Sequence, residues 1–273
     1  MEKKVIRQKQ DLTYLKWSHA RNSSGTAGTF LKSQSTIDGQ KTYYKLSNFD
    51  SEKGIIGHES VNEIIVDRLL CILEIPHLDY QLIHADIEIE GKIYDTWVCA
   101  SKDFKNRGET KAALDDYYIV NKIEDESHYE FCIRNGWKQY IDAMIVIDYL
   151  ILNRDRHGAN IEILRNARKK SLRIAPLFDH GLSLLCSCYT EEEIEKFDIS
   201  KDRPCQNFIG SRSTLDNLDF IEDKKSLFTT KLVETDRERL FEDLENVLSE
   251  SHRNKIWEMI WTRWCHYENL CNL

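Results

Sequence analysis

The sequence predicts an α+β protein: a small, β-rich N-terminal lobe with one helix, followed by a larger helical C-terminal lobe. β-Branched and aromatic segments separated by turn residues occur before residue 100, whereas helical apolar spacings dominate after about residue 115. The chain has 273 residues, of which 41% are hydrophobic and 31% charged, enough to form a core without disulfides or structural metals. We expect the lobes at residues 1–100 and 104–273, joined by a hinge at about 99–103.

The predicted strands of the N-terminal lobe are short segments rich in β-branched and aromatic residues. They are Thr29–Leu31, Thr42–Leu46, Tyr80–Ile83 and Tyr94–Cys99. Asp38-Gly39 and Glu90-Gly91-Lys92 are typical of hairpin turns, so we expect each of them to join two neighbouring strands.

One helix interrupts these strands, and its predicted range is Glu59–Leu73, ending before Pro76. Its apolar residues recur at three- and four-residue spacings, which predicts one buried stripe and one polar face. The stripe consists of Val61, Ile64, Ile65, Leu69, Ile72 and Leu73. Glu59 and Glu63 belong to the polar face.

The C-terminal lobe is predicted to be helical almost throughout. Apolar spacing from Trp137 onward indicates a helix that ends near Leu152. Two long amphipathic helices are expected at about Lys231–Leu248 and His252–Leu270. The acidic run at residues 191–193 is typical of the first turn of a helix, where the helix dipole favours negative charge.

Charge and hydropathy exclude several classes of protein. The chain has 46 acidic and 38 basic residues and a formal charge of −8, so nucleic acid is not expected as the main partner without a local basic patch. The longest apolar runs have about five residues, far below the roughly 18–20 that a membrane-spanning helix needs. No secretory signal is expected, and eight cysteines without a CxxC pair favour reduced thiols, so the predicted location is cytoplasmic.

The chemistry concentrates between residues 153 and 181. A polar loop at Asn153–Asn160 follows a helix, and predicted strands at Ile161–Leu164 and Leu172–Ala175 flank a basic turn and lead to a second polar loop at 177–181. Both loops then leave the same end of a hairpin, so we expect Asp155, Asn160 and Asp179 to converge. Phosphoryl transfer from ATP uses such a set, in which one carboxylate orients the attacking hydroxyl and oxygen ligands hold a divalent metal.

At these residues the sequence resembles the HipA-type bacterial Ser/Thr kinases, and more remotely the phosphatidylinositol 3- and 4-kinases. The matching motifs are D-R-H-x-x-N at Asp155–Asn160 and L-F-D-H-G at Leu177–Gly181, in the order that the family shows. The resemblance implies a protein-kinase-like bilobal fold, with Asp155 as catalytic base and Asn160 and Asp179 as metal ligands. It covers the catalytic core from about Ser23 to the C-terminus and favours a small stand-alone kinase, and a toxin–antitoxin role is not carried over from the family.

The same resemblance implies roles for a lysine and a glutamate of the N-terminal lobe. Lys45 is the candidate for the lysine that contacts the α- and β-phosphates, and Glu59 or Glu63 would hold it through an ion pair. Glu63 is preferred, because the spacing from Asn62-Glu63 to Glu74-Ile75-Pro76 is similar to that in HipA-type chains. The alternatives are that Lys45 is a solvated lysine of an edge strand and that both glutamates simply form the polar helix face.

Two further segments are candidates for nucleotide contacts. The small, polar loop Ser23–Thr29, with Ser24, Gly25, Thr26, Ala27 and Gly28, would let backbone N–H groups approach phosphates. Cys99–Lys102 would be the hinge, where the backbone around Cys99 and Ser101 binds adenine.

The resulting hypothesis is an ATP- and Mg²⁺-dependent kinase that transfers the γ-phosphate to a Ser or Thr hydroxyl of a protein, with its own Ser23 or Ser24 as further candidate acceptors. One alternative is a lipid kinase, a small-molecule kinase or a nucleotidyltransferase on the same fold. Another is a nucleotide-binding pseudokinase that acts as an interaction module. Arg154 and Arg156 would hold a phosphate of the activation segment or pair with surface acids.

Overall fold

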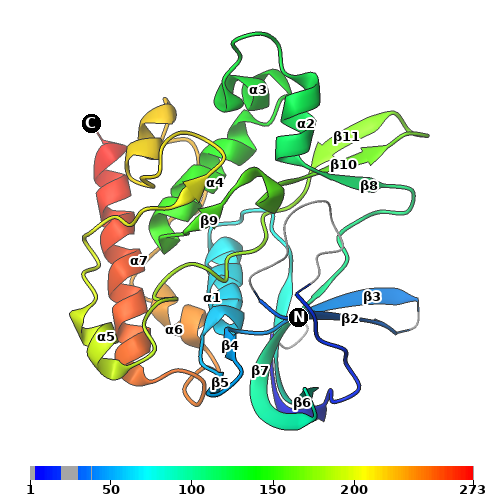
Figure 1. Ribbon diagram of the computed structural model, residues 1–273. Helices are drawn as coiled ribbons and strands as arrows, with labels where there is room; N and C mark the ends of the chain where they lie inside the picture. Colours follow the sequence, from blue (N-terminus) through cyan, green and yellow to red (C-terminus); the bar gives the residue numbers. More distant parts are fainter. Residues whose placement is uncertain (1–3, 20–29, 38, 273) are drawn as a thin grey trace.

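A five-stranded sheet forms the N-terminal part of the computed structural model, which describes residues 4–19, 30–37 and 39–272 (Figure 1). The strand order is β1-β6-β7-β3-β2, and every neighbouring pair is antiparallel except β1 with β6. The strands are β1 (Val5–Asp11), β2 (Lys32–Ile37), β3 (Gln40–Lys45), β6 (Tyr80–Ile89) and β7 (Lys92–Lys102). The predicted Glu90-Gly91 turn is confirmed, since Ile89 pairs with Lys92 and both turn residues have positive φ.

Two strands of this sheet differ from the sequence prediction. Strand β1 was not predicted, because Val5 is its only buried side chain and the segment has no apolar alternation. Parallel pairing with β6 holds it in place. The strand expected at Thr29–Leu31 instead starts at Lys32, where β2 pairs antiparallel with β3. Asp38 of the other predicted turn lies outside the described residues, between paired Ile37 and Gln40.

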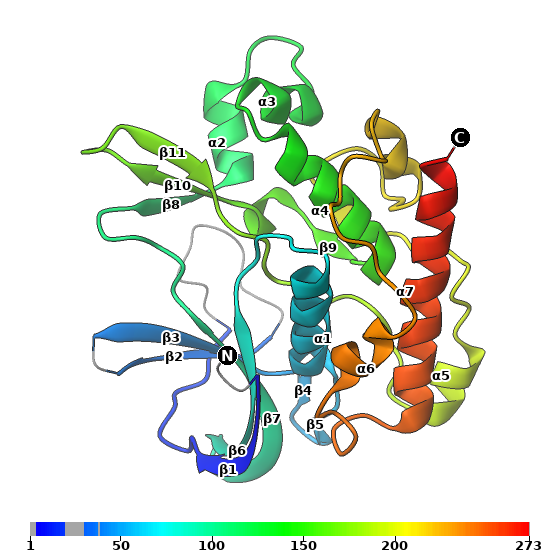
Figure 2. The same cartoon turned by 180° about the vertical axis from the view of Figure 1, so that it is seen from behind.

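Helix α1 (Glu59–Ile72) lies between the sheet and the helical part of the chain (Figure 2). The predicted apolar stripe is buried as expected, but the predicted polar face is buried as well, because 13 of the 14 residues are buried. Its polar side chains have specific partners: Asn62 Nδ2 donates to the carbonyls of Gly181 and Ser183, and an Arg68 guanidinium nitrogen donates to the carbonyl of Leu240. The helix is therefore a core element that joins the two parts of the protein.

The helices of the C-terminal part include α4 and the long α7, which contact each other, while α3 packs on α4, α5 on α7 and α6 on α1. They are α2 (Leu114–Asn121), α3 (His128–Arg134), α4 (Lys138–Ile151), α5 (Glu191–Lys196), α6 (Asp236–Phe241) and α7 (Glu250–Leu270). The acidic run does begin a helix, α5, whose first turn is closed by a capping box between Thr190 and Glu193.

The prediction of one long helix at Lys231–Leu248 is wrong, because only the short helix α6 forms in that segment. Glu242 has a ψ of 132° and Asp243 a φ of 63°, neither of which is helical, so the helix ends after six residues. Leu240, Leu244 and Leu248 are nonetheless buried. The apolar spacing that had indicated a helix therefore places these side chains in the core through turns.

The remaining strands form three small sheets. β8 (Thr110–Ala113), β10 (Glu162–Asn166) and β11 (Ser171–Ile174) are ordered β11-β10-β8, so the predicted hairpin after the first polar loop is present. β9 (Asp155–Arg156) pairs in parallel with β12 (Gln206–Asn207), and β4 (Phe49–Asp50) pairs with β5 (Gly54–Ile55). Among the described residues, no helix is long and apolar enough to cross a membrane, and all eight cysteines are free thiols.

Candidate active site

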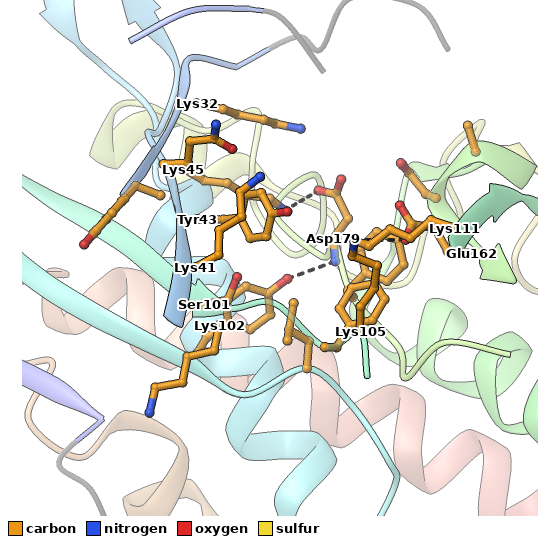
Figure 3. A pocket seen from close by; sticks show the side chains of 18 of the residues that line it. Lys32, Lys41, Tyr43, Lys45, Ser101, Lys102, Lys105, Lys111, Glu162 and Asp179 are labelled. Carbon is orange, nitrogen blue, oxygen red and sulfur yellow. Dashed lines mark hydrogen bonds and ion pairs between the residues drawn. The ribbon is translucent and has the colours of Figure 1, made fainter. Parts of the chain in front are cut away.

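A cleft of about 910 Å³ lies between the five-stranded sheet and the β8–β10–β11 sheet. Its walls come from β3 and β7 on one side and from β8, the end of the first polar loop and the second polar loop on the other (Figure 3). Among the residues predicted for the site, those on the wall are Lys45, Ser101, Asn160 and Asp179.

Lys45, the last residue of β3, links the sheet to α1 and to the second polar loop. Its Nζ lies 2.7 Å from Glu63 Oε1 and 2.7 Å from Asp179 Oδ1. Burial alone would lower the pKa of Lys45, but the two carboxylates outweigh it and raise the pKa well above its ordinary value, so the side chain is charged. Strand β3 lies between β7 and β2, so Lys45 is not a lysine of an edge strand.

Glu63 pairs with Lys45, and Glu59 does not. Glu59 Oε2 accepts a hydrogen bond from the backbone N–H of Asn48 at 2.9 Å. The second oxygen of Glu63 accepts from the backbone N–H of His180 at 2.9 Å, so this carboxylate contacts both Lys45 and the loop that carries Asp179. Glu63 is 1% exposed, so these contacts take the place of hydrogen bonds to water.

Asp179 occupies a left-handed turn with a φ of 61°, a conformation that non-glycine residues adopt rarely. Its backbone N–H donates to Tyr80 Oη at 3.3 Å. Leu177, two residues before Asp179, makes two hydrogen bonds with the segment that follows α1. Its N–H donates to the Pro76 carbonyl, and its own carbonyl accepts from the N–H of Leu78. These contacts with the N-terminal part set where the Asp179 carboxylate points.

The first and last residues of the D-R-H-x-x-N motif, Asp155 and Asn160, contact each other directly. Asn160 Nδ2 donates to the Asp155 carbonyl at 2.8 Å and to Asp155 Oδ2 at 3.2 Å. Asn160 is 2% exposed and lies on the cleft wall, whereas Asp155 lies beside it, off the wall, with its side chain 24% exposed. His157 Nε2 is 3.4 Å from Asp155 Oδ1.

Arg156 joins the two polar loops, a role that the sequence did not reveal. It pairs with Asp148 of α4 at 2.9 Å, and both side chains are buried. A guanidinium nitrogen also donates to the Phe178 carbonyl at 2.9 Å. Arg156 therefore neither holds a phosphate nor pairs with a surface acid. The sequence did hold one indication of this pair: Asp148 is an acid at a position of the predicted helix that faces the core.

Asp115, near the start of α2, is a second residue that the sequence analysis missed. Its carboxylate packs so closely on Gly158 that a Cβ there would lie 2.0 Å from Asp115 Oδ1. Burial raises the pKa of Asp115, although hydrogen bonding to the Ala159 N–H and nearby histidines oppose the rise. Any larger residue at position 158 would therefore displace the Asp115 carboxylate.

The hinge prediction at Cys99–Lys102 needs correction. These residues continue β7, and at positions 99–101 the strand pairs with β3 on one side and β6 on the other. Cys99 is 1% exposed and does not line the cleft, while Ser101 does. Because the sheet uses the backbone groups of both residues, the connection between the two parts of the chain starts after Lys102, at residues 103–109.

The predicted phosphate loop, with Ser24, Gly25, Thr26, Ala27 and Gly28, lies outside the described residues. The structure instead reveals a concentration of positive charge around the cleft. Among the described residues, three acids line it, Glu109, Glu162 and Asp179, against seven lysines: Lys16, Lys32, Lys41, Lys45, Lys102, Lys105 and Lys111. They are spread over almost a hundred positions of the sequence, so no local run of basic residues indicated this patch in an otherwise acidic chain.

No protein-family model and no curated protein sequence matches this chain. Its structure is similar to that of CtkA, a proinflammatory kinase of Helicobacter pylori, with a TM-score of 0.64 and 16% identity over 97% of this chain and 98% of that one. It is also similar to HipA of Shewanella oneidensis MR-1, solved with HipB and operator DNA (TM-score 0.48, 12% identity, 93% and 68% covered). A third neighbour is the Golgi casein kinase (TM-score 0.44, 14% identity, 90% and 71% covered).

The chain therefore has a kinase-like fold, and the α+β architecture expected from the sequence is confirmed. The kinase-like fold that the two loop motifs implied is thus confirmed.

Proposed function

We propose that this protein is an ATP- and Mg²⁺-dependent kinase that transfers the γ-phosphate to a Ser or Thr hydroxyl of a protein. The observation that carries the proposal is the convergence at one cleft of the Lys45–Glu63 ion pair, Asp179 and the Asn160–Asp155 contact. These groups come from four separate parts of the chain, and they match the set that phosphoryl transfer requires.

Lys45 would bind the α- and β-phosphates of ATP. Glu63 is buried behind it and fixes the position of Nζ, so the charge is placed before the nucleotide arrives. Lys105 and Lys111 pair with Asp103 and Glu162, but other lysines of the cleft, such as Lys16 and Lys41, add a positive potential that attracts a triphosphate in spite of the net charge of −8.

The residues present also suit a magnesium ion. Mg²⁺ prefers oxygen ligands, and a carboxylate of Asp179 and the side chain of Asn160 line the same cleft. The nitrogen of the Asn160 amide is turned toward Asp155, so its oxygen is the atom that would bind the ion. A bound Mg²⁺ would neutralise charge on the phosphates. Arg156 keeps the two loops at a constant separation by its contacts with Asp148 and the Phe178 carbonyl.

Asp155 would orient the acceptor hydroxyl and accept its proton. Its Oδ2 accepts a hydrogen bond from Asn160, which restricts the rotation of the carboxylate. An isosteric Asp155→Asn change keeps this size and much of the hydrogen bonding but removes the proton acceptor, so the rate should fall by orders of magnitude.

The test is the intact mass of the purified protein after incubation with ATP and Mg²⁺, alone and with a protein acceptor such as casein. Wild type, Asp155→Asn and the control Asp219→Asn are compared, since Asp219 is exposed and distant in sequence from both loops. We expect phosphate on the protein or the acceptor with wild type and the control, and none with Asp155→Asn. Undiminished transfer by Asp155→Asn would refute the assignment.

The same experiment separates the alternatives. A gain of nucleotide mass would identify nucleotidyl transfer, and phosphate found only on an added lipid or small alcohol would identify a different acceptor class. ATP that raises the melting temperature without any transfer would favour the pseudokinase function.

A further inference from the structure

The β10–β11 hairpin carries an unusual concentration of positive charge. Residues 165–173 contain five basic side chains and no acidic one. They are Arg165, Arg168, Lys169, Lys170 and Arg173. Because these five positive charges belong to a chain of net charge −8, the rest of the molecule carries −13.

Among the described residues, four of these side chains have no acidic partner in an ion pair. Arg173 pairs with Glu109 at 2.7 Å, but within the described part of the chain no ion pair involves Arg165, Arg168, Lys169 or Lys170. All four are exposed. The hairpin therefore offers four positive charges to a ligand that would not have to displace an internal partner first.

The hairpin holds these charges on an ordered scaffold. Strand β10 pairs with β8 on one side and with β11 on the other. The turn is closed by a hydrogen bond from the backbone N–H of Lys169 to Asn166 Oδ1 at 3.1 Å, and Lys170 adopts a φ of 50°. Asn166 itself is buried, so the turn does not depend on the basic side chains.

The hairpin extends outward from the cleft. Strand β10 begins at Glu162, which lines the cleft, and the turn projects away from the body on the side toward which the β2–β3 hairpin also points (Figures 1 and 2). At about 3.3 Å per residue, the turn lies roughly 20 Å from Asn160 along the strand. An extended peptide would need about six residues to span that separation.

We propose that the β10–β11 hairpin docks an acidic segment of the protein acceptor, separated by about six or more residues from the Ser or Thr that receives the phosphate. The inference rests on the proposed kinase function for the identity of the acceptor. The guanidinium groups of Arg165 and Arg168 suit carboxylates, which they bind with two parallel hydrogen bonds.

Charge elsewhere on the molecule favours a short acidic peptide over nucleic acid or an anionic membrane. A duplex or a lipid surface presents negative charge over a large area and would extend past the hairpin and the cleft lysines onto the rest of the chain, where acidic residues are in excess. A segment of a few acidic residues meets the hairpin alone. Charges beyond about 8 Å contribute little at physiological salt, so the attraction is local to the turn.

The test uses a triple variant, Arg168→Gln/Lys169→Gln/Lys170→Gln, which leaves Asn166 and the strands intact. The matched control is Lys53→Gln/Lys201→Gln/Lys225→Gln, because these lysines are exposed, have no ion pair with any described residue and change the charge equally. The probe is a fluorescein-labelled peptide with a Ser and four glutamates six to ten residues away. An analogue with four glutamines and a DNA duplex of similar charge serve as competing probes.

In fluorescence anisotropy with the full-length protein, we expect the acidic peptide to bind wild type and the control at least tenfold more tightly than its glutamine analogue. The hairpin variant should lose that difference, and added salt should weaken the wild-type interaction. Unchanged affinity of the hairpin variant for the acidic peptide would overturn the proposal. Tighter binding of the DNA duplex than of the peptide by wild type would overturn it as well.

This measurement is independent of catalysis, so the two proposals can fail separately. Hairpin-dependent peptide binding without phosphate transfer would support the docking surface and contradict the kinase function. Phosphorylation of the acidic peptide with the same KM by wild type and the hairpin variant would support the kinase and contradict the docking surface. The expected result is a KM raised at least fivefold in the hairpin variant, with kcat unchanged.

Discussion

The Arg156→Met substitution tests whether the buried ion pair between Arg156 and Asp148 is what joins the two functional loops. Both side chains are almost completely buried, and the guanidinium makes three contacts of 2.9–3.2 Å with the Asp148 carboxylate. Methionine has a similar length and removes the charge. The substitution therefore leaves Asp148 as a buried carboxylate whose remaining hydrogen bond comes from Asn153 at 2.8 Å.

Removing one partner of a buried ion pair costs about 3–5 kcal/mol of unfolding free energy, because the other charge is left uncompensated. The hydrogen bond from Asn153 places Arg156→Met near the lower end of this range. At about 2–4 °C per kcal/mol for large domains, the melting temperature should fall by roughly 6–12 °C. The double variant Arg156→Met/Asp148→Leu should recover most of the loss, since an apolar pair has no charge to desolvate.

The assay is urea denaturation followed by tryptophan fluorescence for the wild type, both single variants and the double variant. Lys231→Met is the control, because Lys231 pairs with Glu268 at 2.8 Å but its side chain is 77% exposed, so its loss should cost less than about 1 kcal/mol. A cost below about 1 kcal/mol for Arg156→Met, or single costs that simply add in the double variant, would refute the reasoning.

Three further predictions concern other parts of the structure. Burial would lower the pKa of His77, but Asp67 and its other neighbours raise it to about 10, so the melting temperature should fall as pH rises from 6.5 to 10. His77→Gln should lack this dependence of melting temperature on pH, and the same dependence in the variant would contradict the pairing of His77 with Asp67. Gly158→Ala should cost about 1–3 kcal/mol and slow transfer, because its Cβ overlaps Asp115, and adding Asp115→Ala should restore the melting temperature. Lys45→Met should abolish the rise in melting temperature that ATP produces, whereas Lys225→Met should preserve it.

The sequence by itself determined the elements whose signals are local. Apolar spacing over Glu59–Leu73 and before Leu152 predicted α1 and α4 to within one or two residues, since a helix with a buried face needs that periodicity. The two motifs at Asp155–Asn160 and Leu177–Gly181 likewise predicted two polar loops flanking a hairpin. In each case the residues that decide the conformation are close together in the chain.

Only the tertiary structure decided which distant groups meet. Glu59 and Glu63 share one face of α1 and are equivalent in a sequence pattern, but in the structure Lys45 pairs with Glu63, whereas Glu59 accepts a hydrogen bond from the Asn48 backbone. Strand β1 and the end of α6 show the same dependence, since β1 is held by its partner β6.

The charge around the cleft is the clearest case. Lysines spread from position 16 to position 111 gather on one surface of an acidic chain, and no local pattern in the sequence indicates that gathering. Electrostatic potential depends on distances in space, which the sequence encodes only through packing of the whole molecule.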